Sequence, residues 1–160
     1  MSGHNLPQFI HGIIYLMSDS EIDYEKYDLK RYQYWTVYLH YNQAYLGRNY
    51  IALNRKGSID AFSGTTSEER AELEIIISKL QSVLNDLYQP DIYNYATFGN
   101  TWLRCHWHLI PRYKAPRSLQ GQDFVDNNWG KNYAPYDHSF QISDELFNKI
   151  RQDMTVGLNS

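Results

Sequence analysis

Apolar residues recur at intervals of three and four between residues 66 and 88, the spacing that places side chains on one face of an α-helix. Thr66 and Glu69 occupy the two positions of a capping box, which marks the start of a helix, and Pro90 follows its expected end. The apolar face consists of Leu73, Ile76, Ile77, Leu80, Val83, Leu84 and Leu87. We expect this helix to cover a sheet and to have a structural role.

Shorter segments alternate between apolar and polar residues, which is typical of strands. The first such segment, 35–41, is followed by Asn- and Gly-containing turn residues at 42–47 and by a second β pattern at 50–54, so a hairpin is expected. Further strands are predicted over 92–95 and 104–112. In the first strand the alternation predicts one face with Trp35, Val37, Leu39 and Tyr41, and an opposite face with Thr36, Tyr38 and His40.

The two ends of the chain have weaker patterns. Residues 9–17 fit a strand or a short helix, and the charged residues 18–31 fit a solvated turn with a short helix. Gly, Pro, Asn and Asp throughout 115–137 predict a long loop. Ser143 can cap a final helix whose apolar face has Leu146, Phe147, Ile150 and Met154. The sum is an α+β fold: an antiparallel sheet, one long amphipathic helix packed on it, and an irregular C-terminal third.

Length and composition indicate one domain of 160 residues, with a core at about 35–113 and a C-terminal loop and helix at 114–160. The formal net charge of −3 argues against broad electrostatic binding to nucleic acid. The first residues have no signal-peptide pattern and the apolar run at 9–17 is too short to span a bilayer, so no membrane association and a cytoplasmic location are expected. A single cysteine, Cys105, excludes an intrachain disulfide and suits a reducing compartment.

The predicted strand 104–112 has one face unusually rich in nitrogen. Its alternation places Cys105, Trp107 and Leu109 on an apolar face, and Arg104, His106, His108, Ile110 and Arg112 on the other. Alternate side chains lie within about 7 Å of each other, given a rise of ~3.3 Å per residue. Arginine matches phosphate oxygens and imidazole can attack phosphorus, so this face favours an anion. Two interpretations of Arg112 remain equally open, a phosphate ligand or the partner of an acidic residue.

The same stretch resembles the histidine-triad (HIT) family of nucleotide hydrolases and transferases. The family signature is His-φ-His-φ-His-φ-φ, often followed by Pro-Arg, and residues 104–112 spell Arg-Cys-His-Trp-His-Leu-Ile-Pro-Arg. Asn94-Tyr95-Ala96, Gly99-Asn100 and Tyr45-Leu46-Gly47-Arg48 are also similar to compact bacterial members. The resemblance covers roughly residues 35–113 and implies a HIT-like fold.

The resemblance implies a role for each matching position. His106 corresponds to the nucleophile, and His108 to the histidine that contacts the reacting phosphate and its bridging oxygen. Asn100 lies where a polar side chain holds phosphate. Arg48 occupies a hairpin position that faces the phosphates, and His40 lies near one that contacts ribose.

One position departs from the family pattern, because Arg104 replaces the first histidine. Arginine can still bind a phosphate oxygen, so Arg104 is a further candidate phosphate ligand. The resemblance implies cleavage of a nucleoside phosphoanhydride or phosphoramidate, such as a diadenosine polyphosphate, at the α-phosphorus through a nucleotidyl-histidine on His106. It also implies a homodimer. This chemistry requires no metal or other cofactor, although Mg²⁺ accompanying the substrate is compatible with it.

Two alternatives remain open. Arg104 is also what a non-catalytic nucleotide-binding relative would show, and such a protein would bind mononucleotides without turnover. His106 and His108 alternatively fit a His-x-His metal site, but such a site needs a third ligand, and the nearest candidate histidine in the following sequence is His138. Tyr38, Tyr41 and Tyr50 fit either the core or the stacking of an adenine.

Overall fold

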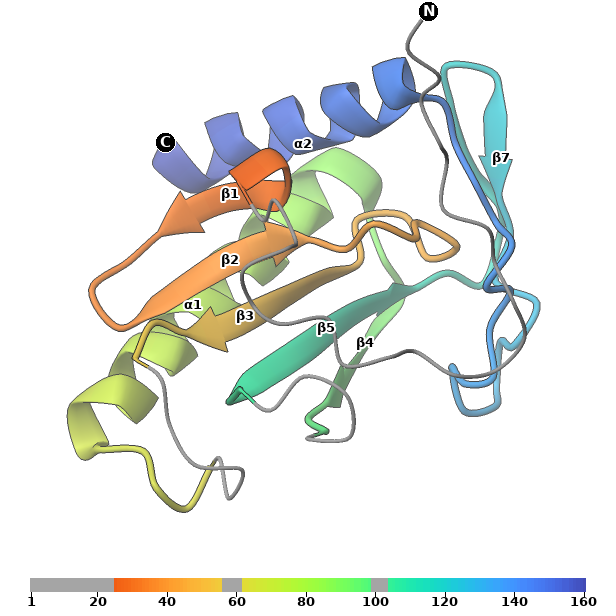
Figure 1. Ribbon diagram of the computed structural model, residues 1–160. Coiled ribbons are helices and arrows are strands. Elements are labelled where there is room, and N and C mark those ends of the chain that lie inside the picture. Colours follow the sequence, from red (N-terminus) through yellow and green to blue (C-terminus); the bar gives the residue numbers. More distant parts are fainter. Residues whose placement is uncertain (1–24, 56–61, 99–103) are drawn as a thin grey trace, which may run out of the picture.

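The computed structural model describes residues 25–55, 62–98 and 104–160. It contains a five-stranded antiparallel sheet in the order β1-β2-β3-β5-β4, and Figure 1 shows one long helix, α1, behind this sheet and the other, α2, along its β1 edge. The strands of the sheet are β1 (Asp28–Arg31), β2 (Trp35–Leu39), β3 (Asn49–Leu53), β4 (Ile92–Ala96) and β5 (His106–Arg112). The helices are the 3₁₀-helix Glu25–Tyr27, α1 (Ser67–Tyr88) and α2 (Asp144–Asn159). The predicted α+β fold is confirmed.

Helix α1 begins with the predicted capping box. The Thr66 hydroxyl accepts a hydrogen bond from the Glu69 amide, and the Glu69 carboxylate accepts one from the Thr66 amide. The helix ends at Tyr88 because Gln89 adopts a left-handed conformation before Pro90. Its buried face includes Leu73, Ile76, Leu80, Val83 and Leu84, which pack with the strands and α2, whereas Leu87 is exposed. The helix therefore covers the sheet, as its periodicity predicted.

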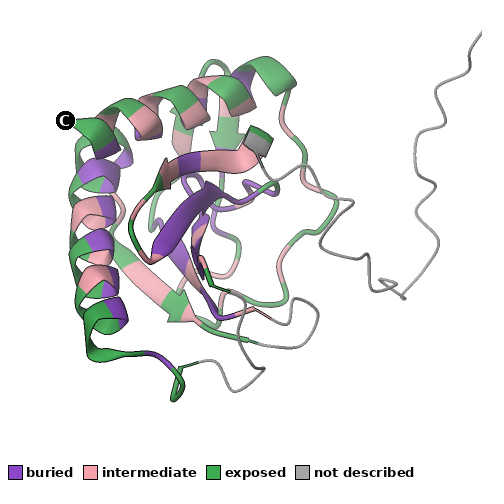
Figure 2. Ribbon diagram, turned by 60° about the vertical axis from the view of Figure 1, so that its left-hand side comes forward, coloured by how far each residue is buried: buried purple, intermediate pink, exposed green. Residues whose placement is uncertain are grey.

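The hairpin of β2 and β3 forms the centre of the sheet and is buried on both faces. Figure 2 shows strands in the colour of buried residues, with the helices to one side and above, whose outer sides are exposed. Trp35, Val37 and Leu39 contribute to the core below α1, as expected. Tyr41 does not, since β2 ends at Leu39 and the Tyr41 side chain is 61% exposed. The predicted strand 35–41 is therefore shorter than expected, and Tyr41 does not share the core face of Trp35, Val37 and Leu39.

Two segments differ from the sequence-based expectations. Residues 28–31 form the edge strand β1, where a turn and short helix were expected. Charged side chains such as Lys30 and Arg31 hid the strand, although its backbone pairs with β2, with a shift of register between Asp28 and Lys30. The expected loop 115–137 contains a hairpin of β6 (Arg117–Leu119) and β7 (Gln122–Phe124), whose polar alternation gave no apolar signal. The segments 9–17 and Gly99-Asn100 lie outside the described residues.

The final helix is confirmed. The Ser143 hydroxyl accepts a hydrogen bond from the Leu146 amide and caps α2. Leu146, Ile150 and Met154 are buried against the sheet and α1, so α2 extends the core beyond the 35–113 region. Among the described residues, no helix is long and apolar enough to cross a membrane.

We predict that Gly47, in the β2–β3 connection, is required for the close approach of this hairpin to α1. Gly47 has φ +79°, and a Cβ atom there would lie 2.5 Å from Leu84 Cδ2. Gly47→Ala is expected to lower the free energy of unfolding by about 2–4 kcal/mol, from left-handed strain plus overpacking, in urea denaturation. Gly121→Ala is the matched control, because Gly121 has the same φ but nothing within 4 Å of the added methyl group. Equal losses in the two variants would contradict the packing argument.

Candidate functional site

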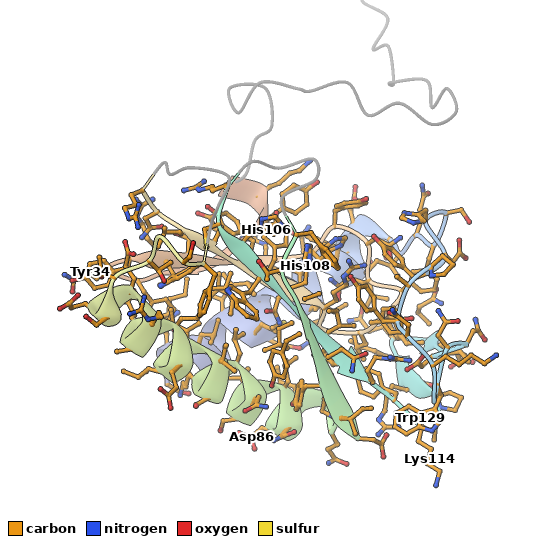
Figure 3. All side chains as sticks on the ribbon, turned by 90° about the horizontal axis from the view of Figure 1, so that it is seen from below. Tyr34, Asp86, His106, His108, Lys114 and Trp129 are labelled. Carbon is orange, nitrogen blue, oxygen red and sulfur yellow. The ribbon has the colours of Figure 1, made fainter. Side chains whose placement is uncertain are left out.

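The candidate site lies on the face of the sheet opposite the helices. The antiparallel register aligns Tyr38 of β2 with Tyr50 of β3, and Tyr50 with His108 of β5, while Ala52 of β3 lies opposite His106. Partners directly opposite each other in antiparallel strands share a face, so these side chains project together. Figure 3 shows the two histidines along β5. The structure thus brings His106 and His108 to one surface, with ring centroids 5.0 Å apart.

His106 is held by the backbone of its own strand. Its Nδ1 lies 2.7 Å from the carbonyl oxygen of Arg104. A carbonyl oxygen can only accept a hydrogen bond, so Nδ1 carries the proton and the lone pair of the neutral ring is on Nε2. Burial lowers the pKa of His106 below its ordinary value. A buried neutral imidazole with a defined tautomer is suited to nucleophilic attack through Nε2.

His108 and His40 form a second imidazole pair next to His106, with centroids 6.0 Å apart. Burial, followed by the neighbouring His106 and Arg48, lowers the pKa of His108 to about 3. Burial, followed by Arg48 and His108, lowers the pKa of His40 well below its usual value. The Nδ1 atom of His108 is buried and has no hydrogen-bond partner in the described part of the chain. Both rings are therefore neutral at pH 7, and His108 has a polar atom available for a ligand.

Arg48 lies beside these histidines, directly before β3, and the described part of the chain offers its side chain no counter-charge. The residue is only 2% exposed, yet its Nε and Nη1 atoms have no hydrogen-bond partner and it forms no ion pair with any carboxylate of residues 25–55, 62–98 or 104–160. The guanidinium instead lies over the ring of Tyr136, with Cζ 4.2 Å from the centroid. A buried cation without a partner carries a large desolvation cost, which a bound anion would offset.

The structure decides between the two interpretations of Arg112. Its Nε and Nη2 atoms donate to the two carboxylate oxygens of Asp126 at 2.6 and 3.0 Å, and its Nη1 donates to Asn94 Oδ1 at 2.6 Å. The ion pair is buried, with side chains 2% and 0% exposed. Arg112 is therefore a structural residue, and of the two interpretations left open by the sequence the structure supports pairing with an acidic residue. Sequence alone could not identify its partner, because Asp126 lies in a predicted loop.

The side chain of Arg104 is already bonded to backbone carbonyl oxygens, which its position in the predicted strand did not indicate. It precedes β5, and its Nε and Nη2 atoms donate to the carbonyl oxygens of Leu53 and Asn54 at 2.7 and 3.1 Å. These bonds fix the guanidinium at the end of β3. A role for Arg104 in phosphate binding stays a prediction. Asn100, the other candidate phosphate ligand, lies outside the described residues.

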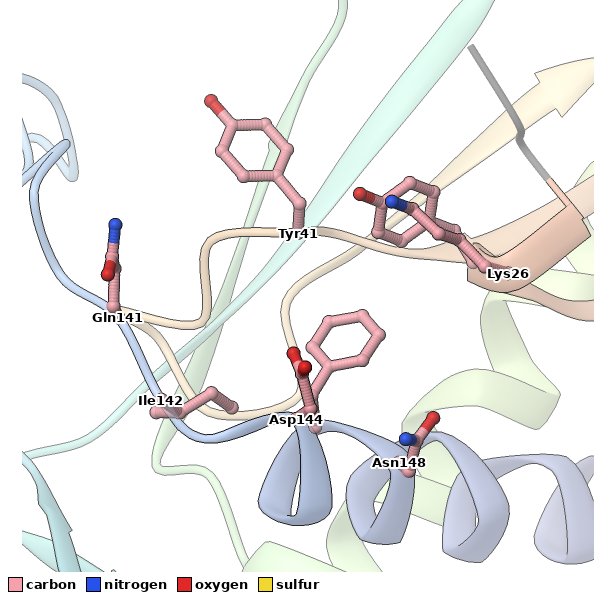
Figure 4. Close-up of a pocket in the computed structure, with 8 residues that line it drawn as sticks. Lys26, Tyr41, Gln141, Ile142, Asp144 and Asn148 are labelled. Carbon is pink, nitrogen blue, oxygen red and sulfur yellow. The ribbon is translucent and has the colours of Figure 1, made fainter. Parts of the chain in front are cut away.

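The aromatic candidates separate into two groups. Tyr38 and Tyr50 stack on each other, with centroids 5.1 Å apart, on the same face as His108. Tyr41 stacks on His40 at 4.6 Å and also borders a cavity of about 500 Å³ (Figure 4). The cavity is lined by Lys26, Tyr27, Tyr41, Gln141, Ile142, Asp144, Phe147 and Asn148. Its volume lies in the range typical of small-molecule sites, and Tyr41 connects it to the imidazole cluster.

Sequence reasoning missed the contribution of the loop after β7. Tyr133 and Tyr136 from this loop lie near Arg48, and the ring of His138 lies 4.3 Å from that of Tyr136. The only signal in the sequence was the density of aromatic residues between 133 and 138 within an otherwise polar segment. Tyrosines are common throughout this chain, so that density pointed to no particular site.

The metal alternative gains no third ligand from the structure. Within the described ranges, no group of three His, Cys, Asp or Glu side chains could hold a metal ion. Cys105 is buried on the core face, and burial raises the pKa of its thiol. The cysteine is therefore a packing residue and not a reactive thiolate.

Comparison of the fold with solved structures finds histidine triad proteins. A histidine triad protein from Sinorhizobium meliloti matches with a TM-score of 0.68 and 14% identity over 91% of this chain and 99% of that one. One from Bradyrhizobium japonicum matches with a TM-score of 0.67 and 15% identity over 82% and 89%. A zinc-bound histidine triad family protein from Mycobacterium smegmatis matches with a TM-score of 0.55 and 12% identity over 82% and 83%.

At the level of sequence, no protein-family model matches the chain and no curated protein matches it. The chain therefore has the fold of histidine triad proteins, and the resemblance inferred from residues 104–112 is confirmed at the level of structure. At these identities the comparison extends to the fold alone.

We predict that His108 makes the stability of the unliganded protein depend on pH. In the unfolded chain this imidazole is protonated below its ordinary pKa of about 6.5, but in the folded protein only near 3. Between these values the unfolded state binds more protons, so the free energy of unfolding falls as pH is lowered. His108→Gln should reduce this slope by up to about 1.4 kcal/mol per pH unit in urea titrations between pH 6.5 and 4. The same slope in both proteins would contradict the depressed pKa.

Proposed function

We propose that this protein is a nucleotide hydrolase or nucleotidyl transferase that cleaves a nucleoside phosphoanhydride or phosphoramidate at its α-phosphorus. The observation that carries the proposal is the buried guanidinium of Arg48, whose Nε and Nη1 find no hydrogen-bond partner among the described residues and which lies beside two neutral imidazoles. This arrangement has excess positive charge and hydrogen-bonding capacity, which a phosphate group would satisfy.

His106 is the proposed nucleophile. Its Nε2 lone pair attacks the α-phosphorus in line, which produces a nucleotidyl-histidine. In a phosphoanhydride the bond from phosphorus to the bridging oxygen breaks and a phosphate leaves; in a phosphoramidate the P–N bond breaks and the leaving amine takes a proton from solvent. The ring becomes cationic in this step, and the hydrogen bond from Nδ1–H to the Arg104 carbonyl oxygen strengthens as positive charge develops. Water then attacks the same phosphorus and releases the nucleoside monophosphate, with the proton passing to solvent.

His108 and Arg48 are the proposed phosphate ligands. His108 lies next to the nucleophile, and Arg48 can stabilise the charge that develops on the nonbridging oxygens. A phosphate leaving group needs little protonation, so the scheme requires no carboxylic acid and no resident metal. Mg²⁺ would enter only as a partner of a polyphosphate substrate.

The cavity beyond Tyr41 is the proposed site of the nucleoside. Its lining includes the aromatic residues Tyr27, Tyr41 and Phe147, and the ring of Tyr41 also stacks on His40 of the imidazole cluster. A nucleobase there would leave the ribose near His40, the position that the family resemblance implied. Diadenosine polyphosphates and adenosine phosphoramidates are the leading substrate candidates, and a homodimer is the expected assembly.

We predict that AMP release depends on His106. Purified protein should release AMP from diadenosine tetraphosphate or an adenosine phosphoramidate, measured by chromatography with and without Mg²⁺. His106→Ala should reduce the rate by at least about a thousandfold, because the covalent route is lost, while AMP binding persists. Trp107→Phe is the matched control: Trp107 is the next residue of β5 but faces the core side, so the rate should remain close to that of the wild type.

Two outcomes would contradict the proposal. AMP binding without turnover by the wild type would identify a non-catalytic nucleotide-binding protein, the alternative that Arg104 suggests. Turnover that His106→Ala leaves intact would exclude His106 as the nucleophile.

A further inference from the structure

We propose that Tyr136, from the loop after β7, is a positioning residue of the anion site that sets its affinity by holding the guanidinium of Arg48 with its ring face. The inference rests on the proposed function in that the anion is taken to be the phosphate of a nucleotide. No motif assigned this role to Tyr136. It follows from the contacts of the loop and of Arg48.

The backbone and the side chain of Arg48 are held in different ways. Its backbone is fixed, because its carbonyl accepts hydrogen bonds from the His40 amide and from Gln43 Nε2. Its side chain has no such fixed partner at Nε or Nη1 among the described residues, and the nearer of the two rings beneath it is that of Tyr136, 4.2 Å from Cζ, against 5.7 Å for Tyr133. An aromatic face attracts a cation without occupying its N–H groups, whereas a carboxylate would occupy them. Tyr136 therefore orients the charge and leaves its hydrogen-bonding edge for an anion.

The loop around Tyr136 is anchored on both sides. Asn128 Nδ2 donates to the carbonyl oxygen of Pro135 at 2.8 Å, and Asn42 Nδ2 donates to that of Asp137 at 3.0 Å. Asn42 is two residues from His40, so one anchor belongs to the site itself. The backbone before and after Tyr136 is thus tied to the body of the domain.

Asn128, the anchor before Tyr136, is itself bonded to β5. Arg112 Nη2 donates to the carbonyl oxygen of Asn128 at 2.7 Å, and Nη1 donates to that of Lys131 at 3.1 Å, in addition to the ion pair with Asp126. Arg112 is on the same strand and face as His108. Arg112 thus fixes the loop that places the ring of Tyr136 on the guanidinium of Arg48. Both arginines lie on the same face of the sheet.

The test compares variants of Tyr136 with and without an aromatic ring. Tyr136→Leu keeps an apolar cover but removes the π system, and Tyr136→Phe keeps the ring without the hydroxyl, which forms no hydrogen bond with the residues described. AMP binding is measured by isothermal titration calorimetry at fixed salt. We expect Tyr136→Leu to weaken binding about threefold to thirtyfold, and Tyr136→Phe to bind like the wild type. Thermal unfolding establishes that each variant is folded, and Tyr136→Met replaces the leucine variant if that one is not.

A double-mutant cycle with Arg48→Met separates positioning from general packing. If Tyr136 acts through Arg48, Tyr136→Leu should cause little further loss of AMP affinity when Arg48 is already replaced. Additive losses, or an unchanged affinity in folded Tyr136→Leu while the wild type binds AMP, would overturn this inference and leave the proposed function standing. A wild-type protein that does not bind AMP would overturn both. Because the readout is binding, the inference is tested whether or not the protein turns substrate over.

Discussion

The ion pair between Arg112 and Asp126 is the interaction on which the arrangement of the site depends. It joins the end of β5 to the loop after β7, and its guanidinium also donates to carbonyl oxygens further along that loop. Burying two charges is costly, and loss of one partner would leave the other uncompensated, so the loop and strand are strongly coupled. Arg48 presents the opposite case on the same face: a buried guanidinium with no carboxylate partner in the described ranges. The contrast between a compensated and an uncompensated arginine distinguishes the structural residue from the candidate ligand-binding one.

The replacement of the first triad histidine by Arg104 has a smaller consequence than the motif suggests. The group that orients His106 is the backbone carbonyl of residue 104, and any residue at that position supplies it. The Arg104 side chain itself is engaged with carbonyl oxygens at the end of β3. The defined tautomer of His106 is therefore compatible with arginine at this position, and the substitution by itself does not argue for loss of catalysis.

Local sequence patterns predicted much of the fold. They failed where the role of a residue depends on a partner that is distant in the sequence. The period of α1, its capping box and the β2–β3 hairpin follow from interactions between neighbouring residues, and all three are confirmed. The pairing of His106 with His108 on one face likewise follows from the period of a strand. The partner of Arg112 and the contact of Tyr136 with Arg48 depend instead on how a distant loop folds back, which no local pattern encodes. The edge strand β1 was missed because backbone pairing stabilises it while its side chains are charged.

The proposed mechanism requires that His106 form a covalent bond to phosphorus. The most direct test is to mix the protein rapidly with an adenylated substrate, quench at alkaline pH to preserve a phosphoramidate, and locate the added mass by peptide mass spectrometry. We expect one adenylate on the peptide that contains His106, absent from His106→Ala and lost on longer incubation as water completes the reaction. An adenylate on another residue, or turnover without any covalent species in a quench fast enough to capture one, would contradict it.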